Sequence, residues 1–229
     1  MPLFQLTQDL IFPNPELAEE DGLLAIGGDL SPERLLLAYS NGIFPWFNEG
    51  DPILWWSLNP RMILFFDHFK CSKSLLRTIK SNKFEIRFDT NFEEVIINCS
   101  KVKRKEQSDT WISNEMIEAY TQLHKLGFAH SVEVYFHDKL VGGLYGVAIG
   151  KAYIGESMFH TMTDASKIAL YHLVILLKKL DFDFIDAQQS TNHLISLGAK
   201  EIERRIYLKL LEDATKHPTY RGNWNKIFE

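Results

Sequence analysis

Two polar residues stand at the end of an apolar segment. Asp186 and Gln188 follow Phe182–Ile185 at a spacing of two, which places both side chains on one face of a strand. Burying a carboxylate there costs free energy unless it gains a partner or a task, so Asp186 is a candidate catalytic group. The alternative is an aspartate that caps the following helix. Gln188 has no useful pKa, but it can orient a reacting group or donate to an oxyanion.

Glu156 is a second carboxylate at the end of an apolar segment. It follows Tyr153 and Ile154 in a stretch with the pattern of a strand. Its side chain could pair with a cationic group of a ligand or with a nearby lysine. The sequence does not separate these two interpretations.

Residues 42–56 form a segment that is unusually rich in aromatic side chains. Five of its fifteen positions are aromatic: Phe44, Trp46, Phe47, Trp55 and Trp56. They follow neither the helical period nor the alternation of a strand, and proline and glycine break the segment into turns. Such rings could stack on a nucleobase or line an apolar pocket. Alternatively, they cover the protein's own core.

Other familiar chemistries lack their motifs. The sequence contains no Gly-x-Ser-x-Gly, His-Glu-x-x-His or paired Cys-x-x-Cys pattern, and no Walker-type loop. The eight histidines are scattered without the spacing of metal ligands. We therefore expect neither a metal site nor a covalent nucleophile.

The second half of the chain must position these groups. Alternating patterns and turns predict an antiparallel meander, followed by a helix, a buried strand and two more helices. The expected ranges are strands at 131–136, 140–149, 152–156 and 182–187, and helices at 165–180, 190–197 and 207–214. Thr163 or Asp164 is expected to cap the first of these helices. This order predicts an α+β fold with helices packed on a mixed, largely antiparallel sheet.

The first half is divided near Asn59-Pro60. Residues 1–60 are rich in turns, with a short helix at 33–40 capped by Ser31. A strand at 62–66 and helices at 73–81, 92–99 and 113–126 follow, the last with Ser113 as its cap. We expect a small N-terminal α+β domain over 1–61, which carries the aromatic segment, and a catalytic domain over 62–229.

Bulk composition is that of an ordinary globular protein. The chain has 229 residues, of which 45% are apolar and 24% charged. No apolar run reaches the length of a membrane span, and the N-terminus lacks the pattern of a signal peptide. With only two cysteines, the chain is expected to be cytoplasmic with free thiols. Nothing in the sequence asks for more than a monomer.

Charge is distributed unevenly along the chain. Residues 1–60 hold nine acidic residues and one basic residue, whereas residues 61–125 hold twelve basic and nine acidic ones. Basic residues on an acidic protein indicate a local contact with a polyanion, although a solvated helix face has the same pattern. The candidates are Lys73, Arg77, Lys80, Lys83, Lys101, Lys103, Arg104 and Lys105.

Several segments, taken together, resemble a known family. Leu23–Pro32, Gly42–Phe47 and Asp51–Ser57 are similar to the N-terminal signature of the leucyl/phenylalanyl-tRNA–protein transferases. The resemblance continues in order through 110–112, 141–147, 155–159, 165–167, 185–188 and 196–199. It spans nearly the whole chain, and the combination of motifs is highly specific.

The resemblance implies a fold and an activity. Members of this family move leucine or phenylalanine, and also methionine, from its tRNA onto the N-terminal arginine or lysine of a protein, which marks that protein for degradation by the N-end rule. The resemblance also implies an acetyltransferase-like (GNAT) core in the C-terminal domain. No ATP, metal or coenzyme A is expected, because the ester to tRNA is already activated.

The resemblance also implies roles for individual residues. Trp46 and Trp111 would contact the 3′-terminal aminoacyl-adenosine, and the basic residues would meet the phosphates of the tRNA. In this setting we expect Asp186 to orient the reacting amine, Gln188 to lie beside the ester carbonyl and Glu156 to meet the positive end of the acceptor. The sequence leaves open how far the acidic groups transfer protons instead of only orienting the amine. The pocket for the transferred side chain would be lined by Leu144, Met158, Leu170, Leu173, Leu177 and Ile185. The same six residues would also suit a plain helix-and-sheet core.

One departure from the family and two rival interpretations remain. Aromatic residues are common in the family where this chain has Leu173 and Leu177, so its preference between leucine and phenylalanine stays open. A coenzyme-A acetyltransferase would need a helix entrance that binds phosphate, but Thr161–Ser166 has no glycine and includes an acidic residue. A module that binds basic N-termini or tRNA ends without chemistry is the non-enzymatic alternative.

Overall fold

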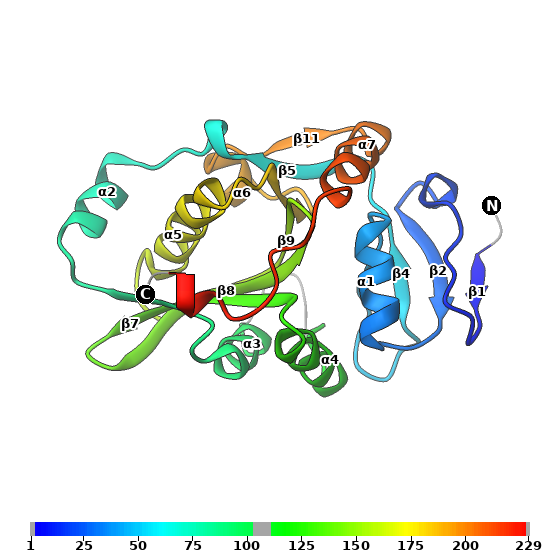
Figure 1. Ribbon diagram of the computed structural model, residues 1–229, viewed down its shortest axis with the longest axis horizontal. Helices are drawn as coiled ribbons and strands as arrows, with labels where there is room; N and C mark the ends of the chain where they lie inside the picture. Colours follow the sequence, from blue (N-terminus) through cyan, green and yellow to red (C-terminus); the bar gives the residue numbers. More distant parts are fainter. Residues whose placement is uncertain (1–2, 103–110, 228–229) are drawn as a thin grey trace.

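The chain forms two sheets that are covered by helices. A computed structural model describes residues 3–102 and 111–227 (Figure 1). The first sheet lies within the N-terminal 56 residues and has the strand order β1-β2-β4-β3. Its strands are β1 (Phe4–Leu6), β2 (Leu23–Gly27), β3 (Phe44–Pro45) and β4 (Leu54–Trp56). The first pair is parallel and the others are antiparallel.

The second sheet is larger and has the order β11-β5-β10-β9-β8-β7-β6. Its strands are β5 (Arg61–Phe65), β6 (Glu85–Phe88), β7 (Ala129–Phe136), β8 (Lys139–Ile149), β9 (Ala152–His160), β10 (Phe184–Gln188) and β11 (Lys200–Ile202). Within the described residues, β9 and β10 are its one parallel pair. The predicted mixed, largely antiparallel sheet of an α+β fold is therefore confirmed.

Helices pack on both faces of the larger sheet (Figure 1). The helices of the described residues are α1 (Pro32–Ser40), α2 (Lys73–Lys80), α3 (Phe92–Ser100), α4 (Asn114–Lys125), α5 (Ala165–Lys179), α6 (Asn192–Ser196) and α7 (Arg204–Thr215). Short 3₁₀ turns lie at η1 (Pro15–Leu17), η2 (Phe66–His68) and η3 (Trp224–Ile227). One apolar cluster joins α1, α3, α4 and α7 to one face of the sheet, and a second joins α2 and α5 to the other.

Alternation along the strands separates the two clusters. In β8, Tyr145 and Val147 belong to the first cluster, whereas Leu144 and Ala148 belong to the second. This is the period of two that a sheet buried on both faces requires. Glycine lets α5 approach closely, because a Cβ at Gly142 would lie 2.5 Å from the Cβ of Ala165.

Local capping signals locate most of the helix starts correctly. The hydroxyl oxygens of Ser31 and Ser113 accept hydrogen bonds from the backbone N–H groups of Arg34 and Met116, as predicted. Asp164 occupies the predicted N-cap position of α5, but its side chain makes no capping hydrogen bond to the backbone. Its carboxylate lies 3.3 Å from Nζ of Lys167.

The aromatic segment is more regular than the sequence indicates. It contains β3 and β4, which pair with each other, so part of the predicted loop is sheet. Phe44, Phe47 and Trp55 are buried, whereas Trp46 and Trp56 are partly exposed. Covering the protein's own core therefore explains the three buried rings but not the two that are partly exposed. The pattern of the sequence also missed β1, β2, β6 and β11.

The division into domains remains our proposal. The smaller sheet ends at Trp56 and the larger one begins at Arg61, so we propose the boundary near residue 61. One apolar cluster nevertheless runs through α1, β4, α4 and α7 and joins the two parts.

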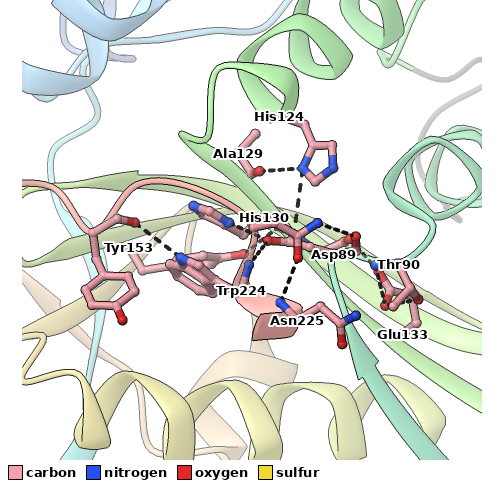
Figure 2. A network of polar contacts seen from close by, with 12 residues as sticks. Asp89, Thr90, His124, Ala129, His130, Glu133, Tyr153, Trp224 and Asn225 are labelled. Carbon is pink, nitrogen blue, oxygen red and sulfur yellow. Dashed lines mark hydrogen bonds and ion pairs between the residues drawn. The ribbon is translucent and has the colours of Figure 1, made fainter. Parts of the chain in front are cut away.

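A buried polar network fixes the C-terminal segment, which runs back from α7 across the molecule (Figure 1). Figure 2 shows Asp89 between the chain at Trp224 and the ring of His130. The carboxylate accepts hydrogen bonds from the backbone N–H groups of Ser131 and Trp224, each at 2.8 Å, and lies 2.8 Å from Nδ1 of His130. The indole of Trp224 stacks on that imidazole with a centroid distance of 3.7 Å.

Replacing the central carboxylate should destabilise the fold. In Asp89→Asn the new amide would direct N–H groups toward donors that the carboxylate now satisfies, so we expect a loss of about 3 kcal/mol in the free energy of unfolding. Urea denaturation measures it. Asp67→Asn is the matched control, because the Asp67 side chain is 91% exposed and its ion pair with Lys178 lies at the surface. A loss of unfolding free energy in Asp89→Asn no larger than that in the control would contradict the role of this network in fixing the C-terminal segment.

Candidate active site

A pocket opens where two neighbouring strands stop pairing. The recorded pairs of β9 and β10 end at Ile154 opposite Asp186. Both strands continue beyond this point, and the residues from Gly155 to Met158 and from Ala187 to Gln189 line a cavity of about 700 Å³. That volume is typical of a small-molecule site. Because the sheet is open here, side chains from both of its faces reach the same cavity.

Most of the predicted catalytic, adenosine-contacting and side-chain-pocket residues meet at this cavity. Glu156, Gln188 and Trp111 line it, together with Trp46 from the N-terminal part. The predicted apolar residues that line it are Leu144, Met158, Leu170, Leu173 and Ile185. Two residues of these three predicted groups do not line it. Leu177 lies on α5 one helical turn beyond Leu173 and is wholly buried. Asp186 is also wholly buried, behind the residues that line the cavity.

Asp186 is held in a buried ion pair. Nε and Nη2 of Arg61 donate to its two carboxylate oxygens at 2.9 and 2.7 Å. The hydroxyl of Tyr207 donates to Oδ2 at 2.7 Å and the backbone N–H of Gln188 donates to Oδ1 at 2.9 Å. Each oxygen thus accepts two hydrogen bonds, which fills the lone-pair sites of the carboxylate. Direct contact with an amine would require one of these donors to leave.

Gln188 connects Asp186 to the cavity. Its backbone lies in the left-handed region, with φ at 59°, at an irregularity in the pairing of β10 with β5. A residue other than glycine rarely adopts this backbone conformation unless its surroundings impose it. Here the hydrogen bond from the Gln188 N–H to Asp186 helps to impose it. From this position its Nε2 donates to Oε1 of Glu156 at 2.9 Å.

Glu156 lies in a different environment from Asp186. It is 9% exposed, and its oxygens accept hydrogen bonds from the hydroxyls of Tyr39 at 2.7 Å and Tyr120 at 3.1 Å. Within residues 3–102 and 111–227, no cationic side chain forms an ion pair with it. Burial raises the pKa of Glu156 to about 7, although the hydrogen bonds from Tyr39, Tyr120 and Gln188 lower it.

The N-terminal part supplies the aromatic side of the cavity. Phe44, Pro45 and Trp46 line it, as does Trp111 from the larger part of the chain. The indole N–H of Trp56 donates to the carbonyl oxygen of Trp46 at 2.7 Å, and the two indoles lie 5.5 Å apart between centroids. This bond holds the Trp46 backbone against β4.

The predicted basic residues do not form one strip. Lys73, Arg77 and Lys80 are exposed on α2, and Lys83 follows them. Lys101 is exposed at the end of α3, on the opposite face of the sheet from α2. Lys103, Arg104 and Lys105 lie outside the described residues.

Sequence reasoning missed the partners of the carboxylates. Arg61, Tyr207, Tyr39 and Tyr120 touch Asp186 or Glu156 from between 21 and 125 positions away along the chain. No local pattern marks them. The buried carboxylates themselves were the available signal, because each requires donors around it.

Metal sites and membrane-spanning helices leave recognisable patterns in a structure. Among the described residues, no three His, Cys, Asp or Glu side chains are grouped so that they could hold a metal ion. The helices of that part of the chain include none with the length and apolar character needed to cross a membrane.

Comparison with known proteins identifies the family. The family profile described as leucyl/phenylalanyl-tRNA protein transferase matches residues 63–212, and that of its N-terminal domain matches residues 28–59. The chain belongs to this family. Leucyl/phenylalanyl-tRNA–protein transferases transfer leucine or phenylalanine from a tRNA to a protein, and this member is accordingly an enzyme and a transferase.

Relatives with this name match almost the entire chain. The protein from Maridesulfovibrio salexigens is 54% identical over 225 residues, which cover 98% of this chain and 94% of the relative. The protein from Thermodesulfovibrio yellowstonii is 55% identical over 229 residues, which cover 100% of this chain and 93% of the relative. The Legionella pneumophila (strain Corby) protein is 52% identical and covers 93% of this chain and 96% of its own.

Similar solved structures include an acetyltransferase. An aminoglycoside acetyltransferase from an uncultured soil metagenomic sample, in complex with sisomicin, has a TM-score of 0.38 at 13% identity, covering 50% of this chain and 84% of its own. L-PGS from Bacillus licheniformis has a TM-score of 0.37 at 13% identity, covering 74% and 54%. Scores this low carry no argument about activity.

The raised pKa of Glu156 should make stability depend on pH. A glutamate in the unfolded chain ionises near pH 4.5, whereas Glu156 in the fold keeps its proton to about pH 7. Between these values the folded state binds more protons, so stability falls as pH rises. Relative to Glu156→Gln, which cannot titrate, we expect the wild type to lose about 3 kcal/mol between pH 4.5 and 7.5.

Urea denaturation of both proteins across this pH range measures the difference. Glu201→Gln, at an exposed position, controls for the removal of one negative charge. A difference between wild type and Glu156→Gln that stays constant with pH would show that Glu156 ionises normally in the fold.

Proposed function

We propose that this enzyme transfers leucine, phenylalanine or methionine from aminoacyl-tRNA to the N-terminal arginine or lysine of acceptor proteins in the cytoplasm, which marks them for N-end-rule degradation. The observation that carries the proposal is the cavity itself, in a chain of this family. Its wall combines apolar side chains, aromatic side chains and the carboxylate of Glu156.

The apolar part suits the transferred side chain. Leu144, Met158, Leu170, Leu173 and Ile185 come from β8, β9, α5 and β10 and present no charge. Burying a leucine or phenylalanine side chain there would contribute about 1.5–3 kcal/mol. Leu177 would act indirectly, by packing behind Leu173. The unbranched, flexible side chain of methionine would fit the same space.

The aromatic part suits the end of the tRNA. We propose that Trp46 and Trp111 contact the terminal adenosine that carries the amino acid, since stacking of a base on an aromatic ring is worth about 1–3 kcal/mol. Trp56 would keep Trp46 in place through its bond to the Trp46 carbonyl.

The polar wall suits the acceptor. We propose that Glu156 faces the cationic end of the acceptor protein and that Gln188 lies beside the ester carbonyl, where its amide can orient the reacting groups. Because its lone pairs are filled, Asp186 would be a positioning residue that acts through Gln188 instead of touching the amine itself.

This arrangement is sufficient for aminolysis of an activated ester. An α-amine has a pKa near 8, so about a tenth of it is neutral at pH 7. Holding amine and ester in attack geometry and stabilising the oxyanion are then the main tasks of the protein. We propose that the reaction uses no ATP, metal or coenzyme A.

The basic residues on α2, with Lys83 and Lys101, would meet tRNA phosphates, as would Lys103, Arg104 and Lys105. Contacts of this kind position the tRNA without reading its sequence and weaken as salt rises. Since α2 and the end of α3 lie on opposite faces of the sheet, we propose that the basic residues on α2 and Lys101 engage different parts of the tRNA.

A transfer assay tests the function directly. Labelled leucyl-tRNA should pass its leucine to a peptide that begins with arginine and leave a peptide that begins with alanine unlabelled. Phenylalanyl-tRNA should compete, because Leu173 leaves the pocket wall aliphatic and open to either side chain. Label on neither peptide would refute the activity, and a complete absence of phenylalanine transfer would refute the proposed breadth of the pocket.

A substitution of Asp186 tests its indirect role. Asp186→Asn removes the charge that holds Arg61 and the Gln188 N–H, so we expect kcat to fall about 100-fold while the Kd for aminoacyl-tRNA changes by less than about threefold. In a Gln188→Ala background the same substitution should lower kcat little further, because Asp186 acts through the side chain of Gln188. Additive losses in the double variant would instead assign Asp186 an independent role. A binding module would keep its affinity and show no turnover in any variant.

A further inference from the structure

Three oxygen-bearing side chains meet behind the cavity wall at Glu156, which itself lines the cavity. The hydroxyls of Tyr39 and Tyr120 each lie within hydrogen-bond distance of the Glu156 carboxylate and of one another. Tyr39 comes from α1 in the N-terminal part, Tyr120 from α4 and Glu156 from β9. All three are buried, and we call this group the Glu156 triad.

The hydrogen bonds within the triad depend on how many protons its three side chains carry. When Glu156 is ionised, both hydroxyls donate to the carboxylate and no proton remains for the contact between the two tyrosines. When Glu156 is protonated, its O–H can donate to Tyr120, Tyr120 to Tyr39 and Tyr39 back to the carboxyl. Every contact then holds one proton. The triad therefore accepts one additional proton without leaving a buried hydroxyl unpaired.

The surroundings of the triad provide hydrogen-bond donors for the Glu156 carboxylate but, among the described residues, no cation that pairs with it. Gln188 on β10 donates an amide N–H to Glu156, and Tyr145 on β8 packs edge-on against Tyr120 with a centroid distance of 5.7 Å. Asp186 on β10 is negative but is paired with Arg61 on β5, and Tyr153 on β9 is directed to the carbonyl oxygen of His130. Burial also raises the pKa of both triad tyrosines, so their hydroxyls stay protonated at neutral pH.

We propose that Glu156 takes the proton that the α-ammonium of the acceptor must lose before attack, and that Tyr39 and Tyr120 are positioning residues that ready it for this step. The N–H bond of the ammonium breaks and the O–H bond of Glu156 forms. The neutral amine then attacks the ester carbonyl carbon. As the C–O bond to the ribose breaks, a second proton passes from nitrogen to the leaving oxygen, and Glu156 returns its proton to solvent.

This inference rests on the proposed function and is tested by the pH dependence of transfer. Tyr39→Phe and Tyr120→Phe each remove one donor to the carboxylate, so Glu156 should ionise about one pH unit higher. For transfer from leucyl-tRNA to a peptide beginning with arginine, kcat/KM of each variant should then fall about tenfold at pH 6 and less than about twofold at pH 9. Tyr135→Phe, at a buried tyrosine on β7, is the matched control and should follow the wild-type profile.

The outcomes separate this inference from the function itself. If the wild type transfers leucine but both variants lose activity equally at all pH values, the tyrosines are merely structural and the inference is overturned. If the wild type transfers nothing, the function fails instead.

A second measurement needs no substitution. In wild-type enzyme labelled at tyrosine Cζ, two NMR signals should shift with the same midpoint as the Glu156 carboxyl, near pH 7. Tyrosine signals that do not change between about pH 5 and 9 would overturn the inference even if the variants did not fold.

Discussion

The buried ion pair between Arg61 and Asp186 is the constraint on which the site depends. Its guanidinium lies between the rings of Phe44 and Tyr207, 4.8 and 4.7 Å from their centroids, and donates to the carbonyl oxygen of Gly42. The pair thus joins β5, β10, α7 and the aromatic segment at one point. Removing either charge would leave the other buried without a partner, which is far costlier than the loss of a surface pair. The pair also fixes the backbone of Gln188, and through it the amide that reaches Glu156.

The pocket follows from the topology of the larger sheet. β9 and β10 are parallel neighbours whose recorded pairs end at Asp186, and the side chains beyond this point no longer have a strand between them. Residues of both apolar clusters, such as Leu144 from one and Trp111 from the other, therefore line one cavity. Ligand sites of open sheets are commonly found where neighbouring strands diverge in this way. An apolar acyl group and a polar acceptor can then approach the same point from different faces.

Local patterns in the sequence were sufficient for much of the fold but not for the environment of the carboxylates. Ser31 and Ser113 cap helices where predicted because capping depends on residues three positions apart. The short strands β1, β3 and β11 have two or three residues each and carry no periodic signal, so they were missed. Asp186 was expected to need a partner or a task. Its partner Arg61 lies 125 positions away, and only the folded chain brings the two together.

Two carboxylates on neighbouring strands are thereby given opposite characters. Asp186 is paired with a buried cation, whereas Glu156 faces only neutral donors among the described residues, and burial raises the pKa of Glu156 to about 7. Such a separation lets one acid serve as a fixed anchor while the other exchanges protons at neutral pH. It also depends on the N-terminal part, because Tyr39 on α1 completes the environment of Glu156 and Phe44 covers Arg61. A chain without residues 1–60 would thus lose the Tyr39 donor to Glu156, the Phe44 ring that covers Arg61 and the wall that Trp46 provides.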